Sequence, residues 1–402
     1  MSNEEILQAM VRRATRRRFL QRAGALGLGT IALPGLLAGC GGDDEEAGAP
    51  AEPAAGPAEV PTASGRLDYL SWEGYDIPDA MKAWTNTNGI DIKTNYIANH
   101  DDIQGKIKAA GSAGGFDLTT YYQGYKPLYA QLQILKPIDE SKLPNLENLD
   151  EFWAGDLGSF WVDADGTRTG VPWTWTPLGL TYDSAKTSAL PSHYDLLDPK
   201  FKGKVAVVDD PTGAWALGTH ILGMKPDEVK KADIAKVNDF LSQIIAQSSG
   251  VSPSFGDVTT KLTSGDAVVA FQGWTAVNQF AADAGTKTIK HTIPKEGGFT
   301  ACDCWAIAST ADNDDAVYSW INETLTPKVH AAAADSVIGG PTVGDAYPLM
   351  SKAVQKLYPA EAQAEALEQA PLYNNPPVES EEFVTFEEVL KNWQELKAGA
   401  QA

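Results

Sequence analysis

The chain has 402 residues, of which 43% are hydrophobic, and this length is sufficient for two or three domains. Its formal net charge is −21, and residues 1–39 hold six arginines and two glutamates, so the remainder carries −25. This balance argues against nucleic-acid binding, which requires basic patches that neutralise phosphates. An acidic surface also keeps proteins soluble, so only individual carboxylates can indicate a cationic ligand.

The N-terminal residues have the features of a bacterial export signal. Thr15-Arg16-Arg17-Arg18-Phe19-Leu20 fits the twin-arginine pattern, and an apolar run follows over 23–38, too short and glycine-rich for an ordinary transmembrane helix. The run ends in Leu37-Ala38-Gly39-Cys40, which resembles a lipobox. We therefore expect a cleaved signal peptide over 1–39 and a lipidated Cys40. A retained anchor helix with an incidental cysteine is the alternative.

The segment 40–65 is rich in Ala, Pro, Gly and Glu and has almost no large apolar residues, which predicts a flexible tether. Beyond Cys40 the sequence contains Cys302 and Cys304, two positions apart in a predicted strand. A disulfide between them would be strained, so we expect two buried thiols. The five histidines are scattered singly, and no metal site is predicted.

From residue 66 onward, strand-like and helix-like patterns alternate. The first series predicts strands over 67–71, 90–97 and 116–121, a strand reaching Trp173, and helices over 78–87 and 101–110. The second series, from Leu178, predicts strands over 204–209, 267–272 and 304–308, and helices over 212–222, 234–247, 316–324, 328–336 and 381–397. Thr212 is a candidate cap for its helix. Two α/β lobes without a loose linker follow from this pattern, with a ligand cleft between them.

Aromatic residues gather at the ends of the predicted strands. The sequence has eleven tryptophans, and the aromatic residues at strand ends are Trp72, Tyr75, Tyr121, Tyr122, Tyr125, Trp173, Trp175 and Trp274. About half are expected to serve core packing. The others would suit a ligand with alkylammonium groups, which aromatic faces attract by roughly 0.5–2 kcal/mol each. No phosphate loop, zinc-protease motif or nucleophile elbow occurs, so no catalytic residue is predicted.

The order of several short motifs resembles the periplasmic spermidine/putrescine-binding proteins. The motifs are Ser71-Trp72-Glu73-Gly74-Tyr75, Gly170-Val171-Pro172-Trp173-Thr174-Trp175, Lys202-Gly203-Lys204-Val205, Pro294-Lys295-Glu296-Gly297-Gly298 and Ile338-Gly339-Gly340-Pro341-Thr342. This resemblance covers nearly all of residues 66–402. It implies the type II periplasmic binding protein fold, an α/β structure whose two hinged lobes close on a ligand and dock on an ABC importer.

The resemblance also implies which residues bind the ligand. Carried over position by position, they are Trp72, Tyr75, Tyr122, Tyr125, Trp175, Asp210, Trp274, Asp303 and Asn374. Trp72, Tyr75 and Trp274 would stack on the ligand, while Asp210 and Asp303 would neutralise its amines. The chain departs from the family where a glutamate becomes Gly213, a tryptophan becomes Ala301 and an aromatic residue becomes Gly340.

Together these features predict a monomeric lipoprotein, held in the periplasm or at the cell surface, that needs no cofactor. It would deliver a small amine or polyamine to the permease subunits of an ABC transporter. Lobe 1 is expected over 66–177 and 303–340, and lobe 2 over 178–302 and 341–402. The alternatives are an amino-acid derivative, a thiamine-like cation or ferric ion as ligand, a sensor role, and an exported hydrolase or redox enzyme.

Overall fold

The computed structural model describes residues 59–97, 100–111 and 115–401. The predicted signal peptide, Cys40 and most of the predicted tether lie outside these ranges. Within them, no helix is both long enough and apolar enough to cross a membrane.

A ten-stranded mixed sheet organises the structure, in the order β2-β1-β3-β9-β4-β7-β5-β6, with β8 and β10 pairing with β4. Its strands are β1 (Arg66–Ser71), β2 (Asp91–Tyr96), β3 (Leu118–Tyr122), β4 (Val171–Asp183), β5 (Val205–Val208), β6 (Ser248–Ser252), β7 (Val269–Trp274), β8 (Ile289–Thr292), β9 (Phe299–Ile307) and β10 (Gly340–Pro341). The neighbours β1, β2 and β3 pair in parallel, as expected for strands joined through helices.

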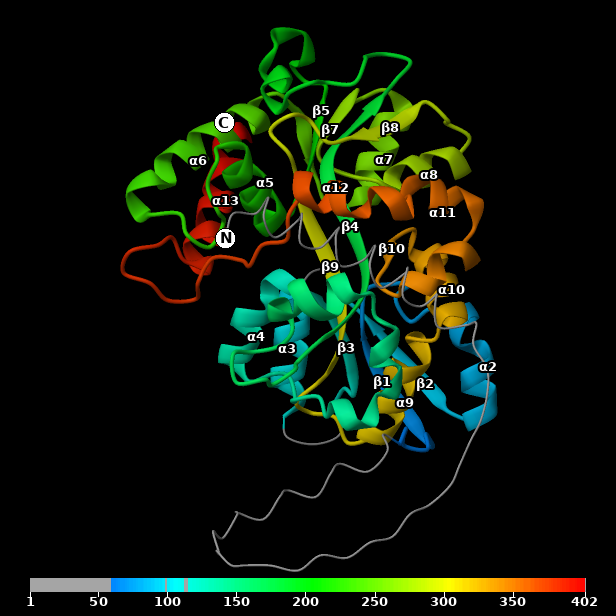
Figure 1. The fold of residues 1–402 in the computed structure, drawn as a ribbon. Coiled ribbons are helices and arrows are strands. Elements are labelled where there is room, and N and C mark those ends of the chain that lie inside the picture. Colours follow the sequence, from blue (N-terminus) through cyan, green and yellow to red (C-terminus); the bar gives the residue numbers. More distant parts are fainter. Residues whose placement is uncertain (1–58, 98–99, 112–114, 402) are drawn as a thin grey trace, which may run out of the picture. The chain divides into compact units, whose positions relative to one another are not determined.

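Three hydrophobic cores lie along this sheet within the described residues, and β4 and β9 pass through the two larger ones. On β4, Trp175 packs in the first core and Leu178 in the second; on β9, Cys302 packs in the first and Phe299 in the second. The two strands pair antiparallel with each other. Figure 1 shows β4 and β9 running between the part with β1–β3 and the part with β5, β7 and β8.

The first core is built on β1, β3 and the C-terminal half of β9, and it also includes Tyr358. The second core is built on β5, β7 and the N-terminal half of β9. The strand expected to end at Trp173 in fact continues to Asp183. That prediction was wrong because β4 is buried along nearly its whole length, so no polar break marks the transition.

The helices are α2 (Pro78–Asn88), α3 (His100–Ala110), α4 (Lys126–Leu132), α5 (Pro211–Ile221), α6 (Ile234–Ala246), α7 (Phe255–Ser264), α8 (Ala276–Asp283), α9 (Asp314–Thr324), α10 (Pro327–Val337), α11 (Lys352–Leu357), α12 (Gln363–Gln369) and α13 (Phe386–Gln401). Most of the helices predicted from the sequence are present with shifted ends. The helices α4, α7, α8, α11 and α12 and the strands β6, β8 and β10 were not predicted.

Two predicted helix starts are wrong. Asp210, rather than Thr212, caps α5, because Pro211 provides a first helical residue that needs no hydrogen-bonded N–H. The final helix begins at Phe386, five residues later than predicted. There the Thr385 N–H donates to Glu388 and the Glu388 N–H donates to the Thr385 hydroxyl, a reciprocal pair that fixes the start of α13.

Cys302 and Cys304 are both fully buried on β9 and are not joined by a disulfide. The prediction of two buried thiols is confirmed.

Candidate functional site

A carboxylate on β9, that of Asp303, lies at the centre of the candidate site. In the sheet Asp303 is directly opposite Tyr122 of β3 on one side and Thr174 of β4 on the other. The Tyr75 hydroxyl, from the loop after β1, donates a hydrogen bond of 2.9 Å to Asp303 Oδ2. Burial is the main influence on this carboxylate and raises its pKa to about 7, against the smaller opposing effect of the Tyr75 hydrogen bond.

Two groups of aromatic rings extend from the neighbours of Asp303, which are Tyr75 and Tyr122. The Tyr75 ring meets the Trp173 ring edge-on at 5.1 Å between centroids, and Trp173 stacks on Trp305 at 4.4 Å. A second group of rings adjoins the first. Trp72 meets His100 edge-on at 5.3 Å, and His100 lies 4.2 Å from Tyr125.

His100 is an uncharged member of this aromatic group. Burial lowers its pKa to about 3, so the imidazole is neutral at physiological pH. A neutral ring adds no positive charge beside Trp72 and Tyr122 and is therefore compatible with a cationic ligand.

Tyr122, the last residue of β3, links the Asp303 side of the site to the second half of the chain. Its hydroxyl donates a hydrogen bond to Asn375 Oδ1. Burial raises the pKa of Tyr122, with a further contribution from the nearby Asp210 carboxylate, so its phenol is protonated and acts as a donor. Tyr122 therefore lies close to both acids that the sequence assigns to the ligand.

Asp210 is engaged within its own helix. Its Oδ1 accepts 3.0 Å hydrogen bonds from the Thr212 hydroxyl and the Gly213 N–H. Burial raises the Asp210 pKa, and these two donors partly oppose that rise. A Cβ atom at Gly213 would collide with Asp210 Oδ2, so no side chain fits there while Asp210 caps α5.

Gln272 lies beside this cap, on β7. It occupies a bulge in the pairing of β4 with β7, and its φ of 58° places it in the left-handed region. Its Nε2 donates a 3.0 Å hydrogen bond to the Asp210 carbonyl, and the residue is completely buried. A strained backbone that holds a buried amide against a site acid is a feature associated with functional sites.

The structure places three of the predicted residues elsewhere. Trp175 is buried in the first core, where its Nε1 donates to the Pro341 carbonyl and its ring packs on Tyr358. Trp274 packs against Phe255 and Phe280, from α7 and α8. Asn374 interacts with Asp227, whereas the next residue, Asn375, meets Tyr122.

Sequence reasoning missed several side chains of this site: Trp173, Asn375, Gln272, Thr212 and His100. Trp173 had been noted as a strand-end aromatic but not assigned to the ligand. Asn375 is one position from the predicted Asn374, a register difference that one sequence does not fix. Gln272 is the polar residue that ends the predicted apolar strand over 267–272, which was the available signal for it.

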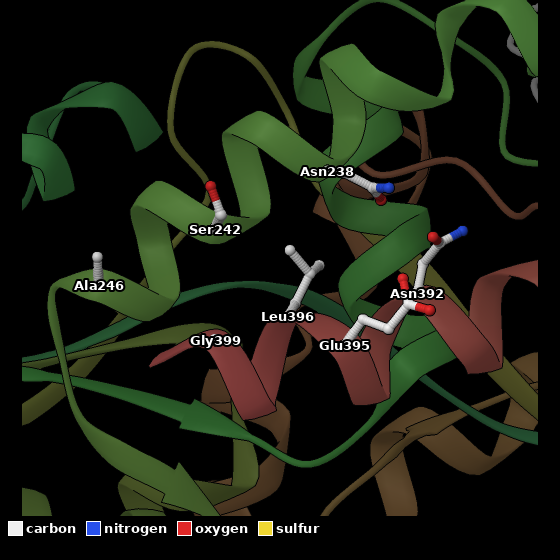
Figure 2. A pocket seen from close by; sticks show the side chains of 7 residues that line it. All are labelled: Asn238, Ser242, Ala246, Asn392, Glu395, Leu396 and Gly399. Carbon is white, nitrogen blue, oxygen red and sulfur yellow. The ribbon is translucent and has the colours of Figure 1, made fainter. Parts of the chain in front are cut away.

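A separate groove of about 450 Å³ lies between α6 and α13 (Figure 2). Its lining residues are Asn238, Ser242, Ala246, Asn392, Glu395, Leu396 and Gly399, none of which belongs to the group around Asp303. No cluster of three His, Cys, Asp or Glu side chains suited to a metal ion occurs within the described residues.

Sequence comparisons place the chain among bacterial binding proteins. The family model of the bacterial extracellular solute-binding proteins matches residues 79–362. The putrescine-binding periplasmic protein SpuD of Pseudomonas aeruginosa is 24% identical over 357 residues, which cover 83% of this chain and 92% of SpuD. The putrescine-binding periplasmic protein PotF of Escherichia coli is 26% identical over 313 residues, covering 73% of this chain and 83% of PotF.

Solved structures agree on the fold. The substrate-binding protein PotD of a Streptococcus pneumoniae spermidine/putrescine ABC transporter superposes with a TM-score of 0.67 at 18% identity, covering 84% of this chain and 98% of PotD. The TpPotD lipoprotein of Treponema pallidum gives the same TM-score and identity over 83% of this chain and 99% of its own.

These matches confirm the two-lobed periplasmic binding protein fold predicted from the sequence. They also confirm the predicted role of capturing a solute for transport. The chain belongs to the family of bacterial extracellular solute-binding proteins.

Proposed function

We propose that this protein captures a small cationic amine of the polyamine class and delivers it to the permease of an ABC importer. The observation that carries the proposal is the Asp303 carboxylate, set among aromatic rings and hydrogen-bonded by Tyr75. A buried carboxylate is costly unless it is paired, and a protonated amine would pair with it. The relatives named as putrescine-binding proteins support the same ligand class.

In this proposal the aromatic rings and Asp303 have different tasks. The faces of Trp72 and Tyr75 would attract the alkylammonium group, while Asp303 would accept its hydrogen bonds. Trp173 is buried between Tyr75 and Trp305 and would hold the Tyr75 ring in place. Asp210 would act mainly through α5, which it caps. The lobes would meet where β4 and β9 pass from one core to the other. On β4 this point lies between residues 175 and 178, and on β9 it lies between residues 299 and 302.

We also propose that the protein is exported and anchored by lipid. Residues 1–39 would serve as a twin-arginine signal peptide, Cys40 would carry the lipid, and the segment after it would act as a tether. The TpPotD relative is itself named as a lipoprotein. The protein would then reside in the periplasm or at the cell surface, next to the permease.

The test is calorimetric titration of the purified protein with putrescine, spermidine, agmatine, amino acids and sugars. Saturable binding of an amine, weakened tenfold or more by Asp303→Asn, is the expected result, because hydrogen bonds to charged groups contribute about 1.5–3 kcal/mol. Binding of a neutral or anionic compound alone, unaffected by Asp303→Asn, would overturn the amine proposal and leave the family assignment intact.

A further inference from the structure

Two buried amide groups beside the site each have one polar atom that is not hydrogen-bonded. Gln272 is completely buried, and its Oε1 has no hydrogen-bond partner within the described part of the chain. Asn375 is 6% exposed, and its Nδ2 likewise lacks a partner among the described residues. The first atom is an acceptor and the second is a donor.

The partner fixes this role for Gln272, and the hydrogen bond from Tyr122 assigns it for Asn375. Gln272 Nε2 donates to the Asp210 carbonyl, which can only accept, so Oε1 is the unused atom. Asn375 Oδ1 accepts from the Tyr122 hydroxyl, which leaves Nδ2 unused. Both side chains are therefore held in place by their partners and are not free to rotate toward other groups.

A short chain of contacts connects the two amides. Gln272 bonds to the backbone of Asp210, and the Asp210 carboxylate accepts from Thr212. Asn375 accepts a hydrogen bond from the Tyr122 hydroxyl, and Thr212 lies close enough to Tyr122 to influence its pKa. The unused acceptor and the unused donor thus flank the same group of residues, and Tyr122 connects this group to Asp303 across the β3–β9 ladder.

Leaving a buried polar atom unpaired costs about 1–3 kcal/mol, so two such atoms at one place call for a reason. Other buried polar atoms are also unpaired within the described residues. They include the indole N–H groups of Trp153, Trp305 and Trp320 in the first core, and Trp173 Nε1, Thr174 Oγ1 and His100 Nδ1 nearer the site. Gln272 and Asn375 are the two amides of this set that adjoin the acids and phenols of the candidate site. There a ligand can complete their hydrogen bonds.

This side of the site places two neutral amides beside the Asp210 carboxylate. Asp210 uses its Oδ1 atom to cap α5, and Gly213 leaves no room for a further acidic side chain. The neighbouring Asp209 is held by Lys397 and by the Trp393 indole. The two amides on this side leave one acceptor and one donor unpaired among the described residues, the combination that an amide group of a ligand can satisfy.

We propose that the ligand carries a protonated amine at one end and an amide at the other, as in an N-acylated diamine or polyamine. Its ammonium group binds Asp303, its amide N–H donates to Gln272 Oε1, and its acyl oxygen accepts from Asn375 Nδ2. This inference rests on the proposed function, since it specifies which amines the same site selects.

The test compares four compounds by calorimetry with the full-length protein in detergent: putrescine, N-acetylputrescine, butylamine and N-butylacetamide. We expect N-acetylputrescine to bind at least tenfold more tightly than each of the other three. Putrescine binding as tightly as N-acetylputrescine, or more tightly, would overturn the inference and leave the proposed function standing. Failure of all three amines to bind would overturn both.

A charge-changing variant tests the role of Gln272 directly. Gln272→Glu supplies a carboxylate where we place the amide of the ligand. This variant should therefore bind putrescine at least tenfold more tightly than N-acetylputrescine, the reverse of the preference expected for the natural protein. Gln243→Glu, at an exposed position of α6, makes the same charge change elsewhere and should keep the original preference. An unchanged preference in a folded Gln272→Glu protein would contradict the assignment. The ligand comparison on the unaltered protein decides the matter if that variant does not fold.

Discussion

The Tyr75 hydroxyl and the Asp303 carboxylate, 228 positions apart in the sequence, are joined by a 2.9 Å hydrogen bond. The bond connects the loop after β1 to the middle of β9. Burial favours the neutral acid, while the hydrogen bond from Tyr75 favours the carboxylate. The balance of these two effects gives Asp303 a pKa of about 7, so its charge state near neutral pH depends on Tyr75.

Replacing Tyr75 by Phe should therefore weaken amine binding at pH 7. Loss of the hydrogen bond raises the Asp303 pKa further, and a rise of one unit, or about 1.36 kcal/mol, reduces the carboxylate population roughly fivefold. The measurement is amine affinity at pH 7 and pH 8.5, where the defect should shrink. Tyr96→Phe removes a comparable bond, from Tyr96 to Asp76 at the surface, and should change nothing. An equal loss at both pH values would show that Tyr75 does not act through the charge of Asp303.

Asp303 should also make the stability of the amine-free protein depend on pH. Its folded pKa of about 7 lies above the ordinary value of 3.8. The protonated Asp303 side chain therefore makes its full contribution to folding stability below pH 3.8, and this contribution is lost as the pH rises toward 7. Relative to Asp303→Asn, the natural protein should lose on the order of 2 kcal/mol over this range, which is less than the full shift because Asp303 is only partly buried.

Melting temperatures of the two proteins at pH 4.5, 6.0 and 7.5 measure this effect. Only the difference between the proteins is informative, because the buried histidines, whose pKa values are lowered, affect both equally. A difference that stays constant across the three pH values would contradict the elevated pKa. Saturating amine should remove most of the pH dependence, since it pairs with the carboxylate.

Trp72→Ala should weaken amine binding about tenfold, because a cation–aromatic contact contributes roughly 0.5–2 kcal/mol. Trp72 is only partly buried and meets His100 edge-on, so its loss should leave the melting temperature of the amine-free protein nearly unchanged. Trp72→Phe retains a ring and should restore most of the affinity. If affinity is unaffected by Trp72→Ala, this ring does not contact the ligand.

Gln123→Ala should destabilise the protein by about 2–4 kcal/mol, because it leaves buried backbone groups unpaired. The fully buried Gln123 amide accepts from the Cys302 N–H at 2.8 Å and donates to the Thr300 carbonyl at 2.9 Å. Chemical denaturation provides the measurement. Gln131→Ala, at an exposed position of α4, should change the stability by less than about 0.5 kcal/mol.

Cys40→Ala should prevent lipidation and change where the protein is found. We expect the natural protein in the membrane fraction, beginning at a lipidated Cys40, and the variant either released or retained with its signal peptide. Peptide mapping of cell-derived protein provides the check. Recovery of intact residues 20–39 from the natural protein would show that no cleavage occurs before Cys40.

The sequence predicts the alternation of strands and helices well, because the apolar periodicity of β1, α2 and α6 is local. It also singles out Asp303 and Tyr75, which lie next to each other in the structure. It could not predict that Asn375, rather than Asn374, meets Tyr122, because that depends on a loop path set by distant contacts. The inward position of Gln272 depends on a bulge in β7, which alters the alternation that the sequence pattern assumes.

The place of β9 in the sheet has a consequence for biosynthesis. Strand β3 near the start of the domain pairs with β9, whose residues 303–307 are translated far later. The first core cannot be completed during early elongation, and contacts so distant in sequence form slowly. The polypeptide must therefore be protected in the cytoplasm until nearly all of it has left the ribosome, and a twin-arginine route, which accepts folded cargo, is compatible with that order of events.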